Sequence, residues 1–154
     1  YFVEMDADFS HRFEDLESIL NVSTDNDVVI GSRYISGGGS LGWDTKRKIL
    51  SKSANLISRI LLKSKIHDMT SGFRCYSSAS LKKIKYYNTQ SDGYSFQIEM
   101  TMRSEVLKLK IREIPIIFSE RRLGNSKMSK KIVYEALFFL VKNGIKKWLN
   151  IKTF

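Results

Sequence analysis

Apolar positions in the first third of the chain alternate between strand-like runs and helical spacing. The runs at 1–5 and 27–35 predict buried strands, and apolar residues three and four positions apart predict a short helix over 12–21 between them. A helix that joins two such strands favours a parallel sheet with right-handed crossovers. The pattern therefore predicts an α/β fold.

The rest of the chain continues this alternation. Polar residues at 66–73 predict a tight loop that leads into a strand, and Pro115 indicates an edge or a bend. The glycine-rich stretch 36–43 lacks the Gly-Lys-Ser/Thr ending of a P-loop, and it fits either a surface linker or a mobile lid. The other predicted elements are helices over 44–62, N-capped by Asp44, 78–84, 94–107 and 128–149, and a strand over 110–118.

Composition and charge narrow the possible functions. The 154 residues, 42% of them hydrophobic, suffice for one core, and the single Cys75 excludes an internal disulfide framework. Residues 1–30 hold eight acidic residues and one basic residue (net −7), residues 44–65 seven basic and one acidic (+6), and residues 121–154 nine basic and one acidic (+8). This distribution suits a metal beside a polyanionic ligand, and it suits a membrane surface equally well.

Two aspartates follow the first strand. At the carboxyl end of a strand in an open α/β sheet, Asp6 and Asp8 can turn into the ligand crevice and hold a hard divalent cation that carries a nucleotide diphosphate. A solvated turn before a helix is the alternative. Lys46, Arg47 and Lys48 oppose the dipole at a helix start, which indicates a nearby anion or a solvated basic face.

Two loops and the last helix carry further candidate residues. Asp68 and Arg74 are expected to pair and hold the loop between them in shape, while Arg121, Arg122 and Lys127 can clamp a phosphate. The apolar run at 136–141 is too short to cross a bilayer, so the last helix is expected to lie in the membrane interface or to pack on protein. His11 and His67 lack the spacing of a catalytic triad, and both are expected to be structural.

Six motifs in order resemble the dolichol-phosphate (polyprenol-phosphate) mannosyltransferases, members of the inverting glycosyltransferase family 2 with a GT-A fold. This fold is Rossmann-like, with a mixed, mostly parallel sheet flanked by helices. The motifs are Met5-Asp-Ala-Asp-Phe-Ser-His11, Asp27-Val-Val-Ile-Gly-Ser-Arg-Tyr34, Lys46-Arg-Lys48, Asp68-Met-Thr-Ser-Gly-Phe-Arg-Cys-Tyr76, Gly93-Tyr-Ser-Phe-Gln-Ile-Glu99 and Arg121-Arg-Leu-Gly-Asn-Ser-Lys-Met-Ser129.

The resemblance implies transfer of mannose from GDP-mannose to dolichyl or polyprenyl phosphate, with inversion and with Mg²⁺ or Mn²⁺ on the donor diphosphate. The implied metal ligands are Asp6, Asp8 and Ser10, and the donor diphosphate would be held by Asp6, Asp8, Arg121, Arg122 and Lys127. Asp8 and Arg122 are expected to act most directly in catalysis. Arg33, Arg47 and Ser51 would bind the acceptor phosphate, and Asp68, Thr70, Ser71, Arg74, Gln97 and Glu99 would support the site.

The resemblance also implies how the chain is organised and where it works. Residues 1–127 correspond to the C-terminal part of a GT-A domain, without the N-terminal nucleotide-binding portion, and 128–154 form the amphipathic C-terminal helix. The expected location is the cytoplasmic face of a membrane, at the endoplasmic reticulum in a eukaryote or the plasma membrane in a prokaryote, with a membrane-anchoring subunit as a possible partner. A glucosyltransferase using UDP-glucose and a non-catalytic basic membrane-binding fragment are the alternatives. Nucleic acid is not expected, because the aromatic residues fall in apolar stripes.

Overall fold

The computed structural model describes residues 1–120, 130–149 and 151, which are built around one four-stranded sheet. The sheet has the order β1-β4-β2-β5, with β1 at Phe2–Glu4, β2 at Val28–Ser32, β4 at Arg74–Tyr76 and β5 at Ile111–Pro115. β4 is antiparallel to both β1 and β2, whereas β2 is parallel to β5. The strands β1, β2 and β5 therefore share one direction, and their carboxyl ends lie at the same edge of the sheet.

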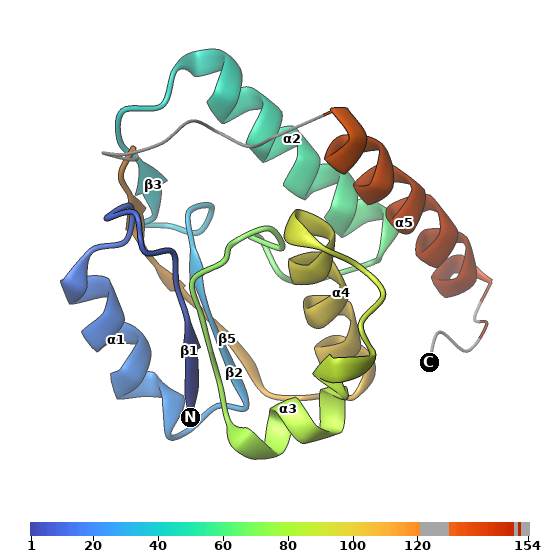
Figure 1. Cartoon of the computed structure of the whole chain (residues 1–154), viewed down its shortest axis with the longest axis horizontal. Helices are drawn as coiled ribbons and strands as arrows, with labels where there is room; N and C mark the ends of the chain where they lie inside the picture. Colours follow the sequence, from blue (N-terminus) through green and yellow to red (C-terminus); the bar gives the residue numbers. More distant parts are fainter. Residues whose placement is uncertain (121–129, 150, 152–154) are drawn as a thin grey trace.

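Helices flank this sheet (Figure 1). They are α1 (Phe13–Ser23), α2 (Thr45–Leu61), α3 (Ser78–Ile84), α4 (Gly93–Val106) and α5 (Lys130–Trp148), with a 3₁₀ turn at Tyr86–Asn88. A small parallel ladder joins β3 (Gly39–Ser40) to β6 (Ile117–Phe118). Asp44 caps α2 as expected, since its carboxylate accepts a hydrogen bond from the backbone N–H of Arg47 at 2.7 Å.

The apolar core lies on both faces of the sheet because side chains alternate along β2. Val29 faces α1, where it packs with Ile19 and Phe73. Val28 and Ile30 face the opposite side, in a core to which α3 and α4 contribute Ile84, Ile98, Met100 and Met102. Leu140 joins this second core, so the inner side of α5 is packed against the domain.

The predicted α/β class is confirmed, with two differences in detail. The strand expected over 110–118 is divided into β5 and β6, and Pro115 is the last residue of β5, at the outer edge of the sheet. The helix predicted over 94–107 begins at Gly93 and ends at Val106.

Candidate active site

An acidic turn follows β1 at the carboxyl edge of the sheet. Asp8 accepts two hydrogen bonds from Ser10, from its backbone N–H at 3.1 Å and from its hydroxyl at 2.5 Å. Ser10 is fully buried, and its carbonyl accepts a hydrogen bond from the backbone N–H of Ser119. The structure thus brings Asp6, Asp8 and Ser10 into one turn, in which Ser10 fixes the orientation of the Asp8 carboxylate.

His11 anchors this turn to the domain. Its ring packs on Phe73 at 4.4 Å and edge-on against Phe118 at 5.2 Å, measured between ring centroids. Its Nε2 lies 3.6 Å from a carboxylate oxygen of Asp6, whose side chain is 49% exposed. The buried imidazole therefore holds the turn in place while the Asp6 carboxylate remains accessible to a ligand.

Arg33 follows β2 directly and forms the central ion pair of the site. Its Nε and Nη2 donate to the two carboxylate oxygens of Asp68 at 2.7 and 2.8 Å, and its backbone N–H donates to the same carboxylate at 3.0 Å. Burial alone would lower the pKa of Arg33 and raise the pKa of Asp68. The contact between them outweighs burial, so that the pKa of Arg33 is raised and the pKa of Asp68 is lowered.

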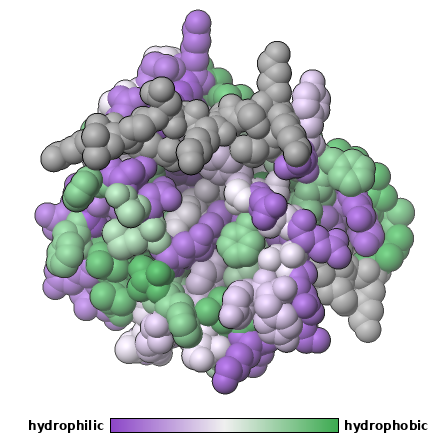
Figure 2. All heavy atoms as spheres, viewed as in Figure 1, coloured by the Kyte–Doolittle hydropathy of each residue, from purple (hydrophilic) through white to green (hydrophobic). Residues whose placement is uncertain are grey.

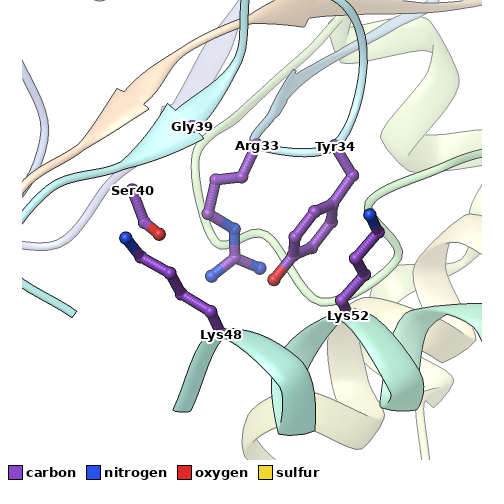
Figure 3. A pocket seen from close by; sticks show the side chains of 6 residues that line it. All are labelled: Arg33, Tyr34, Gly39, Ser40, Lys48 and Lys52. Atoms are coloured by element: carbon purple, nitrogen blue, oxygen red, sulfur yellow. The ribbon is translucent and has the colours of Figure 1, made fainter. Parts of the chain in front are cut away.

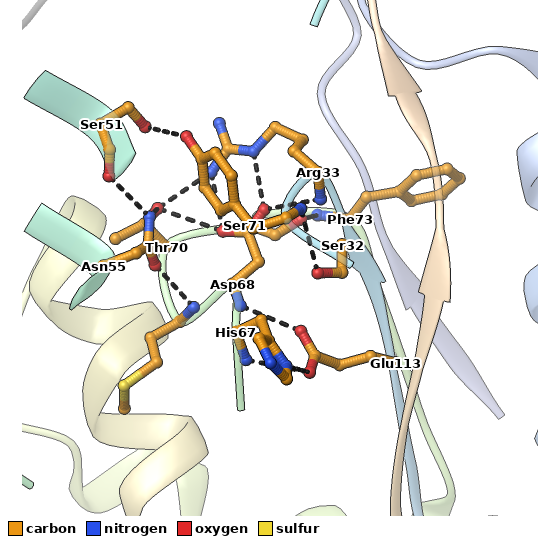
Figure 4. Close-up of polar contacts among 12 residues, drawn as sticks. Ser32, Arg33, Ser51, Asn55, His67, Asp68, Thr70, Ser71, Phe73 and Glu113 are labelled. Carbon is orange, nitrogen blue, oxygen red and sulfur yellow. Dashed lines mark hydrogen bonds and ion pairs between the residues drawn. The ribbon is translucent and has the colours of Figure 1, made fainter. Parts of the chain in front are cut away.

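A hydrogen-bond network holds Asp68 and its loop (Figure 4). Thr70 accepts a hydrogen bond from Arg33 Nη2 at 2.9 Å and another from the side-chain amide of Asn55 at 3.0 Å. Asn55, on the inner side of α2, also accepts from the backbone N–H of Met69 at 2.8 Å. The carboxylate of Glu113 on β5 accepts from the backbone N–H of Asp68 at 2.9 Å. Side chains from α2, β5 and the loop itself therefore fix the position of Arg33.

The expected pairing of Asp68 with Arg74 is wrong. Arg74 is fully buried and donates to the carbonyls of Ser71 at 2.7 Å and Met69 at 2.9 Å, and to the hydroxyl of Thr101 at 2.8 Å. Arg74 thus supports the loop through its carbonyl groups, whereas Asp68 is bound by Arg33. The misassignment arose because two opposite charges six positions apart suggest a local pair, while the actual partner is 35 positions away.

Gln97 and Glu99 have partners other than the loop. The amide of Gln97 donates to Glu4 of β1 at 2.5 Å, and burial raises the pKa of that Glu4 carboxyl despite this bond. Glu99 forms a buried ion pair with Arg103, one turn further along α4, at 2.6 Å. Through Gln97, α4 is therefore connected to the strand that precedes the acidic turn.

A basic pocket of about 410 Å³ opens beside Arg33. It is lined by Arg33, Tyr34, Gly39, Ser40, Lys48 and Lys52. Arg33 and Tyr34 extend from the loop after β2 toward α2, from which Lys48 and Lys52 project (Figure 3). The ion pair with Asp68 uses Nε and Nη2 of Arg33. The third nitrogen, Nη1, makes no hydrogen bond with the residues that the structure describes. Three cationic groups thus line one pocket, which suits an anionic ligand.

Ser51 and Arg47 lie around this pocket. The hydroxyl of Tyr34 donates to Ser51 at 2.6 Å, and burial raises the pKa of Tyr34. Arg47 lies over the ring of Trp43 at 4.1 Å and 3.5 Å from the carboxylate of Glu120. Of the three expected acceptor residues, Arg33 lines the pocket, Ser51 orients one of its walls, and Arg47 is engaged with Trp43 and Glu120.

The turn at Gly38 brings two backbone segments too close together for a side chain. A Cβ at this position would lie 2.4 Å from the carbonyl oxygen of Ser32 and 3.0 Å from the carbonyl carbon of Arg33. At Gly39 the nearest atom would be 3.6 Å away, an ordinary contact. Gly38 therefore allows the glycine-rich segment to fold back onto the residues that form the pocket.

The acidic turn and the basic pocket meet at one aromatic side chain. The Phe118 ring contacts His11, Trp43 and Arg33, at 5.2, 5.4 and 5.7 Å from its centroid. The acidic turn, through His11, and the basic pocket, through Arg33, therefore contact the same ring. Arg121, Arg122 and Lys127, expected on the donor diphosphate, lie outside the residues that the structure describes.

Sequence reasoning missed several residues of the site. Lys52, Tyr34, Asn55 and Glu113 were not among the candidates, and Lys48 was noted only as part of a basic helix start. Lys48 and Lys52 are four positions apart on a helix whose N-terminus carries an unfavourable cluster of positive charge. That i, i+4 spacing was the available signal for Lys52. Asn55 and Glu113 act through contacts distant in sequence, for which the sequence gives no local signal.

Comparison with known proteins identifies the class of protein that this fold and site define. Residues 1–85 match the model of glycosyl transferase family 2, and the chain belongs to that family. It is 46% identical over 145 residues to the polyprenol monophosphomannose synthase of Mycolicibacterium smegmatis, and 43% identical over 143 residues to the undecaprenyl-phosphate mannosyltransferase of Micrococcus luteus. These matches cover 94% and 93% of the chain but 55% and 59% of the two relatives. The family resemblance seen in the sequence is thereby confirmed.

Proposed function

We propose that this chain carries the transfer site of an enzyme that moves mannose from GDP-mannose to polyprenyl phosphate, with inversion at the anomeric carbon. The observation that carries the proposal is the arrangement around Phe118, whose ring contacts both His11 of the acidic turn and Arg33 of the basic pocket. The two relatives support the proposal, because their names describe a polyprenol monophosphomannose synthase and an undecaprenyl-phosphate mannosyltransferase.

The acidic turn offers oxygen donors of the kind that Mg²⁺ and Mn²⁺ prefer. Asp6 and Asp8 offer carboxylate oxygens, and Ser10 holds the Asp8 carboxylate through two hydrogen bonds. Within residues 1–120, 130–149 and 151, no three His, Cys, Asp or Glu side chains gather at a metal site. A cation on two aspartates keeps positions for diphosphate oxygens. When bound there, it would offset the negative charge that develops on the departing nucleoside diphosphate.

The basic pocket would receive the acceptor phosphate. A phosphate monoester is largely ionised at neutral pH, so its oxygen attacks without a general base. The bond from this oxygen to the anomeric carbon forms on one face of the sugar while the bond to the diphosphate breaks on the other. Arg33, Lys48 and Lys52 hold the nucleophile and reduce the repulsion between the two anions.

A transfer assay tests this assignment. We expect wild-type protein to transfer mannose from GDP-mannose to polyprenyl phosphate. Lys52→Ala should raise the KM for the acceptor roughly ten- to hundredfold, the value of one charge-assisted contact, and leave the KM for the donor within a few-fold. Lys46→Ala is the matched control, because Lys46 is exposed on α2 outside the pocket. Equal effects of the two substitutions, or an effect on the donor alone, would contradict the placement.

We further propose that the outer side of α5 contacts the membrane surface at which the acceptor lies. Phe138, Val141 and Ile145 are each at least half exposed on that side. Figure 2 shows hydrophobic side chains along the right-hand margin of the view, where Figure 1 places α5. No described helix is long and apolar enough to span a bilayer. We expect co-sedimentation with anionic vesicles that weakens at high salt. A chain that stays in solution at low salt would overturn the proposal.

A further inference from the structure

The outer face of α2 is apolar and exposed. Ile49, Leu50, Leu56, Ile57 and Ile60 are 44–61% exposed, and they are named here the α2 stripe. The inner face of the same helix is polar, with Asn55 and Ser58 buried. An amphipathic helix normally buries its apolar side, so α2 is inverted relative to the usual arrangement. An exposed apolar surface of this extent indicates a binding site.

The α2 stripe begins at the basic pocket. Lys48 and Lys52 line the pocket from α2, and Lys52, Leu56 and Ile60 follow one another at four-residue spacing. Residues at this spacing lie one above the other on a helix. From Ile49 to Ile60 the helix rises about 16 Å, at about 1.5 Å per residue. An apolar track therefore leads away from three cationic groups along one helix.

α5 packs beside this track without covering it. Gly144 allows the close approach, because a Cβ at this position would lie 3.2 Å from the carbonyl oxygen of Leu61. The indole N–H of Trp148 donates to that same carbonyl at 3.1 Å, and Lys63 lies over the Trp148 ring at 4.0 Å. These contacts involve the C-terminal end of α2. The five side chains of the α2 stripe remain open to a ligand.

We propose that the α2 stripe binds the isoprenoid chain of the acceptor lipid while the phosphate of that lipid occupies the pocket of Arg33, Lys48 and Lys52. The inference rests on the proposed function and names how its acceptor is held. The argument is one of complementarity. A single anionic head on a long apolar chain matches a single cationic pocket that continues into a single apolar track. Affinity for the acceptor therefore depends on the length of its isoprenoid chain through the stripe, whereas the pocket contacts only the phosphate.

Calorimetric titration of the chain with farnesyl phosphate and with inorganic phosphate tests the inference. The test variant is Leu56→Ser/Ile60→Ser, and Phe13→Ser/Leu20→Ser on α1 is the matched control. All four side chains are 45–81% exposed, so folding should survive, and thermal unfolding checks this. In the wild type we expect farnesyl phosphate to bind at least about 30-fold more tightly than phosphate, a ratio set by apolar burial. The α2 variant should lose most of this preference for farnesyl phosphate and keep its phosphate affinity, whereas the α1 variant should keep both.

The other outcomes overturn the inference in distinguishable ways. If both ligands bind wild type equally, or if the α2 variant retains the ratio, the stripe does not hold the chain, while the phosphate pocket and the proposed function stand. If neither ligand binds, the acceptor pocket fails, and the proposed function fails with it. A further measurement compares binding to anionic vesicles that contain no prenyl phosphate. If the α2 substitutions weaken this vesicle binding as much as they weaken farnesyl phosphate binding, the stripe contacts the bilayer and not the isoprenoid chain.

Discussion

Replacing Asp68 by alanine is expected to destabilise the chain by about 3–5 kcal/mol, because it leaves the Arg33 guanidinium buried without its counter-charge. Arg33 is 8% exposed and Asp68 is fully buried, so water cannot replace the lost carboxylate. Urea unfolding at neutral pH followed by circular dichroism measures the loss. The double variant Arg33→Met/Asp68→Leu is the control, since removing both charges should cost less than removing one. A single-variant loss below about 1 kcal/mol would contradict the structural role given to the pair.

The same pair predicts how stability depends on pH. The pKa of Asp68 is lowered from its ordinary 3.8 because Arg33 outweighs the effect of burial. The unfolded chain therefore binds a proton at this group more readily than the folded chain does. The stabilisation is fully present above the ordinary pKa and is lost as the pH falls through the lower folded-state pKa. Urea unfolding repeated toward acid pH should show the difference between wild type and the double variant shrinking.

Replacing Asp8 by asparagine is expected to lower the rate of mannosyl transfer by roughly 10²- to 10⁴-fold, since metal stabilisation of a departing diphosphate contributes several kcal/mol. The asparagine keeps an oxygen that can accept a hydrogen bond from Ser10, but it lacks the negative charge that attracts the cation. Initial rates at varied Mn²⁺ measure the loss, and the variant should need more metal. Asp25→Asn, in the exposed turn after α1, is the matched control.

Calorimetry adds a second readout for the acidic turn. We expect Mn²⁺ to bind appreciably only in the presence of GDP, because Asp6 and Asp8 leave most of the coordination shell to other ligands. Tight binding of the metal to the protein alone, or an unchanged transfer rate in Asp8→Asn, would contradict the proposed role of these two aspartates.

Periodicity and capping residues predicted most of the fold, whereas long-range contacts decided the features that were missed. The spacing of apolar residues located α1 and α4, and Asp44 marked the start of α2. Three-residue β4 carries no signal of its direction, so the sequence could not reveal that it is antiparallel. The α2 stripe is apparent in the sequence, but periodicity alone does not tell whether such a stripe faces the core or the solvent.

The candidate site divides in the same way. The position of Asp6 and Asp8 after a strand made them candidate ligands, and the structure places both in one turn with Ser10 and His11. Their role as metal ligands stays a prediction. The partner of Arg33 was not predictable, because Asp68 approaches it only when the chain returns to β4. The role of Glu113 on β5 was not predictable either, because it accepts a hydrogen bond from the backbone of Asp68, which is distant in the sequence.

The antiparallel strand β4 also acts as a spacer. It lies between β1, which leads to the acidic turn, and β2, which leads to the basic pocket. Neighbouring strands lie about 4.8 Å apart, so inserting one strand separates the ends of β1 and β2 by about 10 Å. In the proposed reaction, this separation would leave room for a sugar ring between the diphosphate on one side and the phosphate on the other. The width of a single strand would then set the distance across which the glycosyl group passes from donor to acceptor.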